Sequence, residues 1–447
     1  MMIKSHNFPF SAWPLINNEF YKTMKVLVVG NGGREHALCN SIQLSCQCEK
    51  LFCIPGSEAI ASIAECHPIN INDNLAIVEY CKQHKIAFVI VGPEVPLTNG
   101  LVDDLESNNI NAFGPNKKGA MLEKSKIYTK EICDEYDVPT GHYKKFNDSE
   151  KAYQYCANIP FPTVIKADGL AAGKGVIIAQ NQKEAEQAIS KCMKEEVFSD
   201  AGREIIIEEY LEGEEVSLFA LVDETGFILP LTTAQDHKKI NEGEKGLNTG
   251  GMGAYCPVPS ISEEQMNTLS DQFVSPIVKA LQKRNIAFKG MFYAGIILTK
   301  NGPKLLEINV RFGDPETQAV LPRIKSDVLE LLLAASTGNL YQVTKIEWDS
   351  RYCMTVVMST KGYPEDYPKD TPMPNLDAIN LSKDDYVFHS GTKKQNGGWV
   401  SNGGRVLAVS SLGETIDKVR DNVYSTINQI EWKNGYYRKD IGWRYRQ

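Results

Sequence analysis

The segment 163–178, TVIKADGLAAGKGVII, decides how the rest of the chain is interpreted. Its two ends, 163–167 and 176–179, are short, apolar and partly β-branched, which predicts two strands. The loop between them is rich in glycine, so backbone N–H groups can approach an anion, and Lys166 and Lys174 add positive charge. We therefore predict a hairpin that grips phosphate.

The P-loop is the nearest familiar alternative, but this segment departs from it. The stretch from Gly169 through Gly173 to Gly175 has one residue too few between its first glycines, and no Ser or Thr follows Lys174. A strand-like run follows where a P-loop has a helix. An ordinary solvated turn with two surface lysines stays open, because a short motif needs context.

Length and composition exclude several classes of protein. A chain of 447 residues predicts about three domains, and a formal net charge of −8 argues against nucleic acid as a partner. No run approaches the roughly 18 apolar residues of a membrane helix. The eleven cysteines are scattered and odd in number, which favours reduced thiols in a cytoplasmic protein. Residues 1–23 are expected to be a dispensable extension.

Strand and helix patterns alternate near the start of the chain. The run KVLVVG at 25–30 leads into a glycine turn and a helix, an order suited to phosphate binding. Strand-like runs at 51–54 and 87–92 end in similar turns. Glu35 replaces the third glycine of a dinucleotide fingerprint, which argues against a nicotinamide cofactor. The three turns should meet at one edge of a parallel sheet, although they are also compatible with plain connections. The turn residues are Asn31, Gly32, Gly33, Gly56, Ser57, Pro93 and Glu94.

Helical periodicity predicts helices over 119–136, 183–194, 264–284 and 326–338, and a last helix that begins near Ile416. The run REIIIEEYLEGEE at 203–215 predicts a strand with an acidic end, which could present backbone groups and a carboxylate to adenine and ribose. A solvated acidic end is the alternative. The long polar loop 232–255 is more typical of function than of structure. It carries Asp236, His237, Lys238, Asn248, Thr249 and Gly250.

Two further strand-like runs meet at the turn Asn301-Gly302, and the second contains a candidate metal site. Glu307 and Asn309 are two residues apart, so on a strand they face the same side and can offer oxygens to one cation. Arg311 is on the same face and can neutralise a carboxylate or a phosphoryl oxygen. The alternative without a functional role is a half-buried strand whose polar side faces solvent.

Taken together, nine segments resemble the glycinamide ribonucleotide synthetase family of the ATP-grasp superfamily. They are VLVVGNGGREHAL, VGPEVPL, IKADGLAAGKGV, IEEYLEGEE, QDHKK, NTGGMGAY, EINVRFGDPET, NGGRVL and RKDIGWR. The resemblance implies an α/β and α+β multidomain fold. It comprises a parallel-sheet, Rossmann-like domain at 24–123, an ATP-grasp domain at 124–349 with a mobile lid at about 144–210, and a small α+β domain at 350–447. It also implies ATP-dependent ligation of glycine to 5-phosphoribosylamine through a glycyl phosphate, with Mg²⁺ or Mn²⁺, and transient contact with neighbouring purine-pathway enzymes.

The resemblance also implies a role for individual residues. ATP phosphates would be held by Lys126, Lys166 and the loop Gly169, Gly173, Lys174 and Gly175. The adenine and ribose would meet Glu208, Glu209, Leu211 and Glu215. The metal ligands would be Glu307 and Asn309, and catalysis would involve Arg311, Asp236 and Lys238. The substrates would be bound by Asn31, Gly32, Gly33, Gly56, Ser57, Pro93, Glu94, Asn248, Thr249 and Gly250.

The sequence departs from the family pattern at two substrate positions. Leu247 stands where proline is frequent, and Ser57 stands where asparagine is frequent. Two other functions stay open: an ATP-grasp ligase that uses another acyl acceptor, such as bicarbonate, and a nucleotide-binding regulatory protein without catalysis. Loss of Glu307, Asn309 or Arg311 would be typical of the regulatory protein, and the chain has all three.

Overall fold

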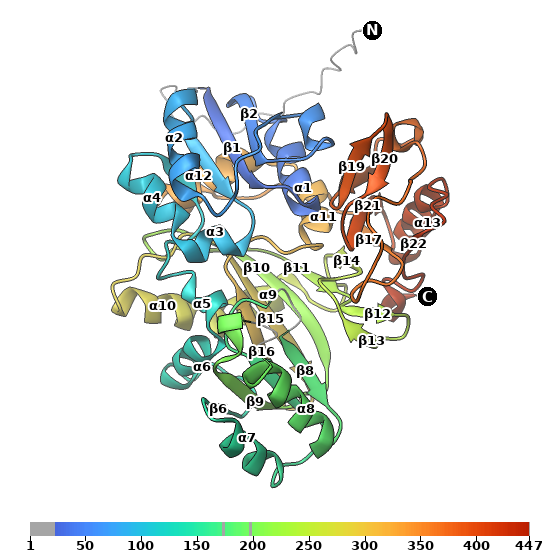
Figure 1. The fold of residues 1–447 in the computed structure, drawn as a ribbon. Helices are drawn as coiled ribbons and strands as arrows, with labels where there is room; N and C mark the ends of the chain where they lie inside the picture. Colours follow the sequence, from blue (N-terminus) through green and yellow to red (C-terminus); the bar gives the residue numbers. More distant parts are fainter. Residues whose placement is uncertain (1–22, 172–174, 196–198, 447) are drawn as a thin grey trace.

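The computed structural model describes residues 23–171, 175–195 and 199–446. The predicted extension, apart from Thr23, and the predicted phosphate-binding residues Gly173 and Lys174 lie outside these ranges. The remaining chain forms three sheets of four or more strands, two small hairpins and thirteen α-helices among the described residues (Figure 1).

The first sheet is parallel and has the strand order β3-β2-β1-β4-β5, as the alternating pattern predicted. Gly30 is in register with Pro55, and Val29 with Val91, so the turns that follow these strands meet at one edge. The elements of this region are β1 (Met24–Gly30), α1 (Gly33–Ile42), β2 (Cys48–Pro55), β3 (Glu65–Cys66), α2 (Asn74–His84), β4 (Phe88–Val91), α3 (Glu94–Asn99), α4 (Leu101–Ser107) and β5 (Asn111–Phe113).

The strands at the two ends of segment 163–178 form an antiparallel pair, as predicted. Thr163 pairs with Ala179 and Lys166 with Val176, and the hairpin lies in a four-stranded sheet with the order β6-β9-β7-β8. This sheet and its helices have a hydrophobic core of their own, which includes Phe146, Ile189 and Ile207. The lid therefore packs as a separate unit. Its elements are β6 (Tyr143–Phe146), α7 (Ser149–Cys156), β7 (Thr163–Ala167), β8 (Val176–Ala179), α8 (Gln182–Met193) and β9 (Ile205–Glu209).

A nine-stranded sheet runs from the middle of the chain to its C-terminal region, in the order β16-β15-β10-β11-β14-β17-β21-β18 with β22 beside β17. The predicted hairpin at Asn301-Gly302 is confirmed as the β15–β16 pair. The strands are β10 (Glu214–Val222), β11 (Ile228–Asp236), β14 (Gly253–Cys256), β15 (Gly290–Thr299), β16 (Gly302–Asn309), β17 (Tyr352–Thr360), β18 (Asp385–His389), β21 (Arg405–Gly413) and β22 (Gly435–Tyr436).

Two small hairpins and five helices complete this part of the chain. The hairpins are β12 (Lys239–Asn241) with β13 (Lys245–Asn248), and β19 (Thr392–Gln395) with β20 (Gly398–Ser401). The helices are α9 (Glu263–Phe273), α10 (Ser275–Lys283), α11 (Thr317–Val320), α12 (Val328–Ser336) and α13 (Ile416–Ile427). The C-terminal region does not merely pack against the central one, because β14 of the central region pairs with β17 along four residues.

Two predicted helices are each divided in the structure. The prediction over 119–136 becomes α5 (Met121–Lys124) and α6 (Lys126–Glu135), because Ser125 leaves helical geometry and caps α6 by accepting from the Tyr128 N–H. The prediction over 264–284 becomes α9 and α10, because Pro276 has no N–H to donate within a continuous helix. The hydrophobic pattern continues across both breaks, which is why periodicity alone missed them.

All eleven cysteines are free thiols. Among the described residues, the longest apolar helices are too short or too polar to cross a bilayer.

Three histidines with low pKa values predict a loss of stability in acid. Burial, with the neighbouring His389, lowers the pKa of His36 to about 3; burial also lowers the pKa of His237 to about 3 and of His389 to about 4. Below pH 6.5 the unfolded chain binds protons that the folded chain rejects, so stability is complete above pH 6.5 and is lost as the pH falls toward 4. Each histidine contributes about 1.4 kcal/mol per pH unit in that window. Urea midpoints measured from pH 7.5 to 4.5 will show the decrease.

A control variant isolates one of these histidines. The backbone N–H of His389 donates to His36 Nδ1 over 3.0 Å, so this contact joins the N-terminal and C-terminal regions. His36→Asn retains an acceptor near Nδ1 but cannot be protonated, and its urea midpoint should fall less steeply with pH. Equal slopes for the variant and the parent would contradict this source of acid sensitivity.

Candidate functional site

One cavity of about 640 Å³ collects residues from the lid, the nine-stranded sheet and both terminal regions. The predicted site residues that line it are Pro93, Glu94, Lys126, Lys166, Gly169, Gly175, Glu208, Glu209, Leu211, Glu215, Asp236, Lys238, Asn248, Thr249, Gly250, Glu307, Asn309 and Arg311. Residues separated by more than 200 positions in the sequence therefore meet at one place.

The N-terminus of α6 is tied to the start of the glycine loop. Asp168 accepts hydrogen bonds from the Ser125 hydroxyl and from the Ile127 N–H, and Lys126 Nζ donates to the Gly169 carbonyl over 3.0 Å. Burial lowers the pKa of Lys126. An anion in the cavity would offset that burial, so Lys126 is placed to meet phosphate.

Lys166 belongs to a buried group of three charges. Its ammonium lies 2.5 Å from Glu208 Oε2 and donates to the Leu306 carbonyl over 3.1 Å. Glu208 also pairs with Lys130 on α6, whose pKa is lowered by burial. All three side chains are less than 10% exposed. Glu208 thus binds two lysines at the wall of the cavity, and the group has a net positive charge.

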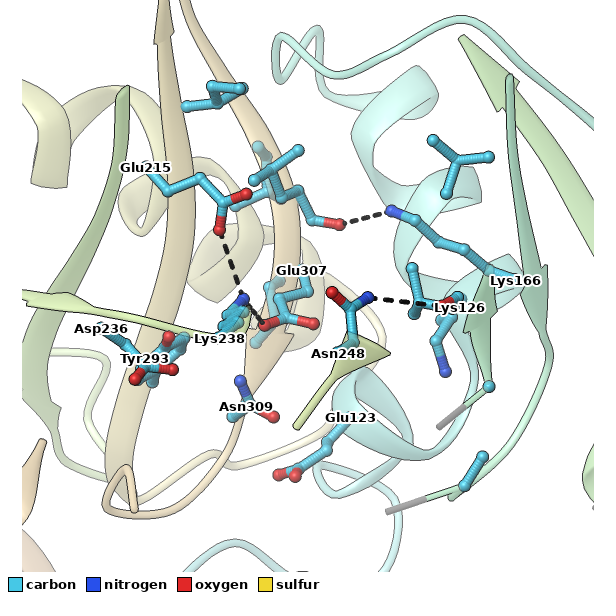
Figure 2. Close-up of a pocket in the computed structure, with 18 of the residues that line it drawn as sticks. Glu123, Lys126, Lys166, Glu215, Asp236, Lys238, Asn248, Tyr293, Glu307 and Asn309 are labelled. Atoms are coloured by element: carbon cyan, nitrogen blue, oxygen red, sulfur yellow. Dashed lines mark hydrogen bonds and ion pairs between the residues drawn. The ribbon is translucent and has the colours of Figure 1, made fainter. Parts of the chain in front are cut away.

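Lys238 bridges two carboxylates on the opposite wall (Figure 2). Its Nζ lies 3.0 Å from Glu307 Oε1 and 3.5 Å from Glu215 Oε2. Lys238, helped by Lys166 and Lys126, lowers the pKa of Glu307 to about 2 despite burial. Burial opposes the charge of Lys238, but Glu307 and Glu215 outweigh it and raise the pKa of this lysine well above its usual value. Both groups are therefore charged at neutral pH.

Glu307 and Asn309 together fit a magnesium ion. Both lie on β16 and both line the cavity, one as an ionised carboxylate and the other as an amide. Oxygen ligands of these two kinds suit Mg²⁺, which completes its shell with water and substrate phosphates. Within the described ranges there is no cluster of three His, Cys, Asp or Glu side chains that could hold a metal without ligands from water or substrate. The donor set therefore matches an ion that arrives with a nucleotide.

Arg311 connects the metal strand to the N-terminal region. Strand β16 ends at Asn309, but the Arg311 guanidinium still donates to Asn309 Oδ1 over 3.2 Å. It also lies 2.9 Å from Glu123 and 3.4 Å from Glu94. These acids outweigh burial and raise the pKa of Arg311, so the cation is permanent.

Asp236, Tyr293 and Glu316 lie near Lys238, and we call these three residues the acidic corner. Burial and the nearby Glu316 raise the pKa of Asp236 well above its usual value, and the same two causes raise the pKa of Tyr293. The Oδ1 atom of Asp236 is buried without a hydrogen-bond partner among the described residues. A cation at this oxygen would stabilise the ionised form that burial and Glu316 disfavour, so the site favours a cationic ligand.

Five predicted substrate residues do not line this cavity: Asn31, Gly32, Gly33, Gly56 and Ser57. The Gly32 N–H donates to Glu35 and the Gly33 N–H donates to Ser390, so protein groups satisfy two amides at the start of α1. A Cβ on Gly92 would lie 2.2 Å from Glu35 Oε1, so the first and third turns close tightly around this glutamate.

Several lining residues were missed by reasoning from the sequence. Lys130 follows Lys126 by four positions, so helical spacing could have indicated it. Arg405 and Arg444 occur in motifs that were recognised but not assigned a role. Arg405 donates to the carbonyls of Gly250 and Asp314 and pairs with the Asp314 carboxylate at 3.0 Å. Other missed residues include Arg34, Glu123, Tyr293, Asp314 and Glu316.

Family models match most of the chain in three consecutive parts. Residues 24–123 match the phosphoribosylglycinamide synthetase N domain, residues 124–317 its ATP-grasp (A) domain and residues 353–444 its C domain.

Individual relatives agree with this result. A phosphoribosylamine–glycine ligase of Rhizobium meliloti is 46% identical over 94% of this chain and 98% of its own length. A solved phosphoribosylamine–glycine ligase of Thermotoga maritima has a TM-score of 0.80 at 28% identity, covering 93% of this chain and all of that one. The biotin carboxylase domain of a Hydrogenobacter thermophilus 2-oxoglutarate carboxylase has a TM-score of 0.74 at 16% identity, covering 93% and 92% of the two chains. This last likeness shows a shared fold alone.

Proposed function

The chain belongs to the phosphoribosylglycinamide synthetase family, and on this premise we propose which residues carry out its reaction. It is an ADP-forming ligase of purine biosynthesis that joins glycine to 5-phosphoribosylamine. The γ-phosphoryl group of ATP passes to the glycine carboxylate, and the amine of 5-phosphoribosylamine then displaces phosphate from the glycyl phosphate. Both steps depend on positioning and charge neutralisation more than on a protein nucleophile.

We assign the ATP phosphates to the positive wall formed by Lys126 and Lys166. The Lys130–Glu208 pair fixes Lys166. Gly169 and Gly175 also line the cavity, and a loop that covered the phosphates there would exclude water from the acyl phosphate. The adenine lies along the backbone at 208–211, and Glu215 accepts hydrogen bonds from the ribose. The observation that carries this assignment is the convergence of these lysines with ionised Glu307 in one cavity.

Glu307 and Asn309 would hold the divalent metal, which neutralises phosphate charge when bound. Magnesium is the expected ion, and manganese is a proposal on the same oxygen ligands. Lys238 pairs with Glu307 at 3.0 Å. Lys238 therefore serves as a neighbouring cation that can also meet the transferred phosphoryl group.

Glycine fits between the acidic corner and Arg311. Its ammonium group would satisfy the buried Oδ1 of Asp236, and its carboxylate would then point toward Lys238 and the phosphates. The 5-phosphoribosylamine would bind beside Pro93 and Glu94, with Asn248, Thr249 and Gly250 on the other side. The turns 31–33 and 55–57 do not line the cavity, so their role in binding this substrate stays a prediction from the sequence. Arg34 lines the cavity beside Glu94 and adds positive charge there.

Asp236→Asn is expected to raise the KM for glycine on the order of tenfold to a hundredfold, because it removes the charge that pairs with the ammonium group. In the parent protein this KM should rise as the pH falls, since protonation of Asp236 removes the same charge. In the variant it should not depend on pH. Steady-state ADP release at several pH values measures both effects, and an unchanged KM for ATP is the internal control. A glycine KM equal to that of the parent would contradict the assignment.

The overall reaction is tested by omitting each substrate in turn. ADP release should require both glycine and 5-phosphoribosylamine. Release driven by bicarbonate would instead indicate a carboxylating enzyme, and ATP binding without turnover would indicate a regulatory protein.

We propose four further features. They are the domain limits 24–123, 124–349 and 350–447, a cytoplasmic location, the absence of a nucleic acid partner and transient contact with neighbouring enzymes of the pathway.

A further inference from the structure

The motif RKDIGWR, at 438–444, lies in a segment beside the cavity, which Arg444 lines. We call residues 436–445 the C-terminal strap. The Arg438 side chain is fully buried, and it forms a bidentate pair with Asp440, with distances of 2.8 and 2.9 Å. It belongs to the C-terminal region by sequence, but the other hydrogen bonds of its guanidinium go to Lys239 and Glu244 of the central region.

The strap binds the hairpin β12–β13 at several points. Arg438 donates to the Lys239 carbonyl over 3.0 Å and to Glu244 over 2.8 Å. Asp440 accepts from the Gly243 N–H over 2.8 Å, and the Tyr436 hydroxyl donates to the Ile240 carbonyl over 2.9 Å. These contacts reach strand β12 and the turn that connects it to β13.

The strap also binds His237 and Glu214, which directly precede Lys238 and Glu215, two side chains that we assign to ATP. The Gly442 N–H donates to His237 Nε2 over 3.3 Å, and His237 directly precedes Lys238. Because Nε2 accepts this bond, the ring proton lies on Nδ1, which faces the Gly253 carbonyl. The Tyr445 hydroxyl donates to Glu214 over 2.7 Å, beside Glu215. His237 is thus a structural link and is not available as a general base.

The hairpin in turn holds one wall of the cavity. Its base is closed by Thr249, whose N–H and hydroxyl both donate to the Lys238 carbonyl over 2.8 Å. Asn248 at its end donates to the Val176 carbonyl, directly after the glycine loop (Figure 2). Lys238, Lys239, Glu244 and Asn248 all line the cavity.

We propose that the C-terminal strap is a positioning element for ATP, in which Arg438 fixes the β12–β13 hairpin and thereby the place of Lys238 between Glu215 and Glu307. The inference rests on the proposed role of Lys238 at the nucleotide. Without the Arg438 guanidinium, Asp440 and Glu244 lose their common partner, and the hairpin loses its hydrogen bond at the Lys239 carbonyl. Lys238 then has to be ordered by ATP itself, which weakens ATP binding.

The test compares Arg438→Met and Arg438→Lys with Arg351→Met. Arg351 is a matched control, because it also pairs with two carboxylates, Asp349 and Asp384, in the C-terminal region but does not line the cavity. ATP binding with Mg²⁺ is measured by calorimetry on the full chain, together with amide hydrogen exchange and the thermal midpoint. We expect Arg438→Met to weaken ATP binding about tenfold and to speed exchange at 239–248, with a smaller effect for Arg438→Lys.

Arg351→Met should lower the thermal midpoint but leave ATP binding and exchange at 239–248 unchanged. If Arg438→Met only lowers the midpoint and binds ATP as the parent does, the strap is merely structural and the proposal is overturned. If that variant does not fold, Arg438→Lys decides by the same criteria. The binding measurement needs neither glycine nor 5-phosphoribosylamine, so a failure of the proposed reaction would be recognised separately. Unchanged ATP binding in Lys238→Met would identify a wrong assignment of that lysine.

Discussion

Glu307→Gln is expected to reduce ADP formation on the order of a hundredfold to a thousandfold. The substitution retains the shape of the side chain but removes the only charge that Glu307 can offer to a cation. The pKa of Glu307 is about 2, so the carboxylate is ionised at every pH at which the enzyme is expected to work. The measurement is steady-state ADP release as a function of Mg²⁺ concentration.

Glu307→Gln also tests whether the Glu307 carboxylate binds the metal ion or ATP itself. ATP should still bind to Glu307→Gln without metal, because Lys126 and Lys166 remain in the wall that we assign to the phosphates. Asn309→Ala should reduce turnover in the same direction but by less, since an amide contributes no charge. Near-normal turnover of Glu307→Gln at saturating magnesium would refute the metal assignment.

Glu208→Leu is expected to destabilise the protein by about 3–5 kcal/mol. Glu208 is 2% exposed and pairs with Lys130 and Lys166, so its removal leaves two buried ammonium groups without their common partner. Because Glu208 lies on β9, next to the core of the lid, unfolding should begin there. Urea denaturation followed by tryptophan fluorescence and by hydrogen exchange of the lid amides will measure this effect.

The matched control for this variant is Glu131→Leu. It makes the same chemical change in an ion pair with Lys145 whose side chains are about half exposed, and it should cost much less stability because solvent screens the pair. Adding Lys130→Met to Glu208→Leu should restore part of the lost stability, because one unpaired charge disappears. Equal losses for Glu208→Leu and Glu131→Leu would show that the buried group contributes no more than a surface pair.

Local patterns were sufficient to locate many elements of the site. The strands at 163–167 and 176–179, the hairpin at Asn301-Gly302 and the shared side of Glu307 and Asn309 all follow from alternation and turn chemistry within a few residues. The breaks at Ser125 and Pro276 were missed, because the apolar pattern on both sides was continuous.

Sequence reasoning could not identify partners that come from distant segments. Asp236 and His237 are neighbours in the chain, but their environments differ. One oxygen of Asp236 has no hydrogen-bond partner in the described part of the chain, whereas the His237 ring is held between Gly253 and Gly442. Only that difference separates a ligand contact from a structural link. Similarly, two amides of the predicted phosphate turn are already engaged by Glu35 and Ser390.

The hairpin at 163–178 illustrates the same division. Its residues alone specified two strands joined by a glycine loop, together with the lysines beside it, because β-propensity and glycine geometry act over a few residues. They did not specify that Lys166 would be held by Glu208 or that Glu307 would face it from another sheet. Nor did they specify that a strap near the C-terminus would fix Lys238. Burial and charge pairing depend on which segments the folded chain brings within a few ångströms, and only the tertiary structure supplies that information.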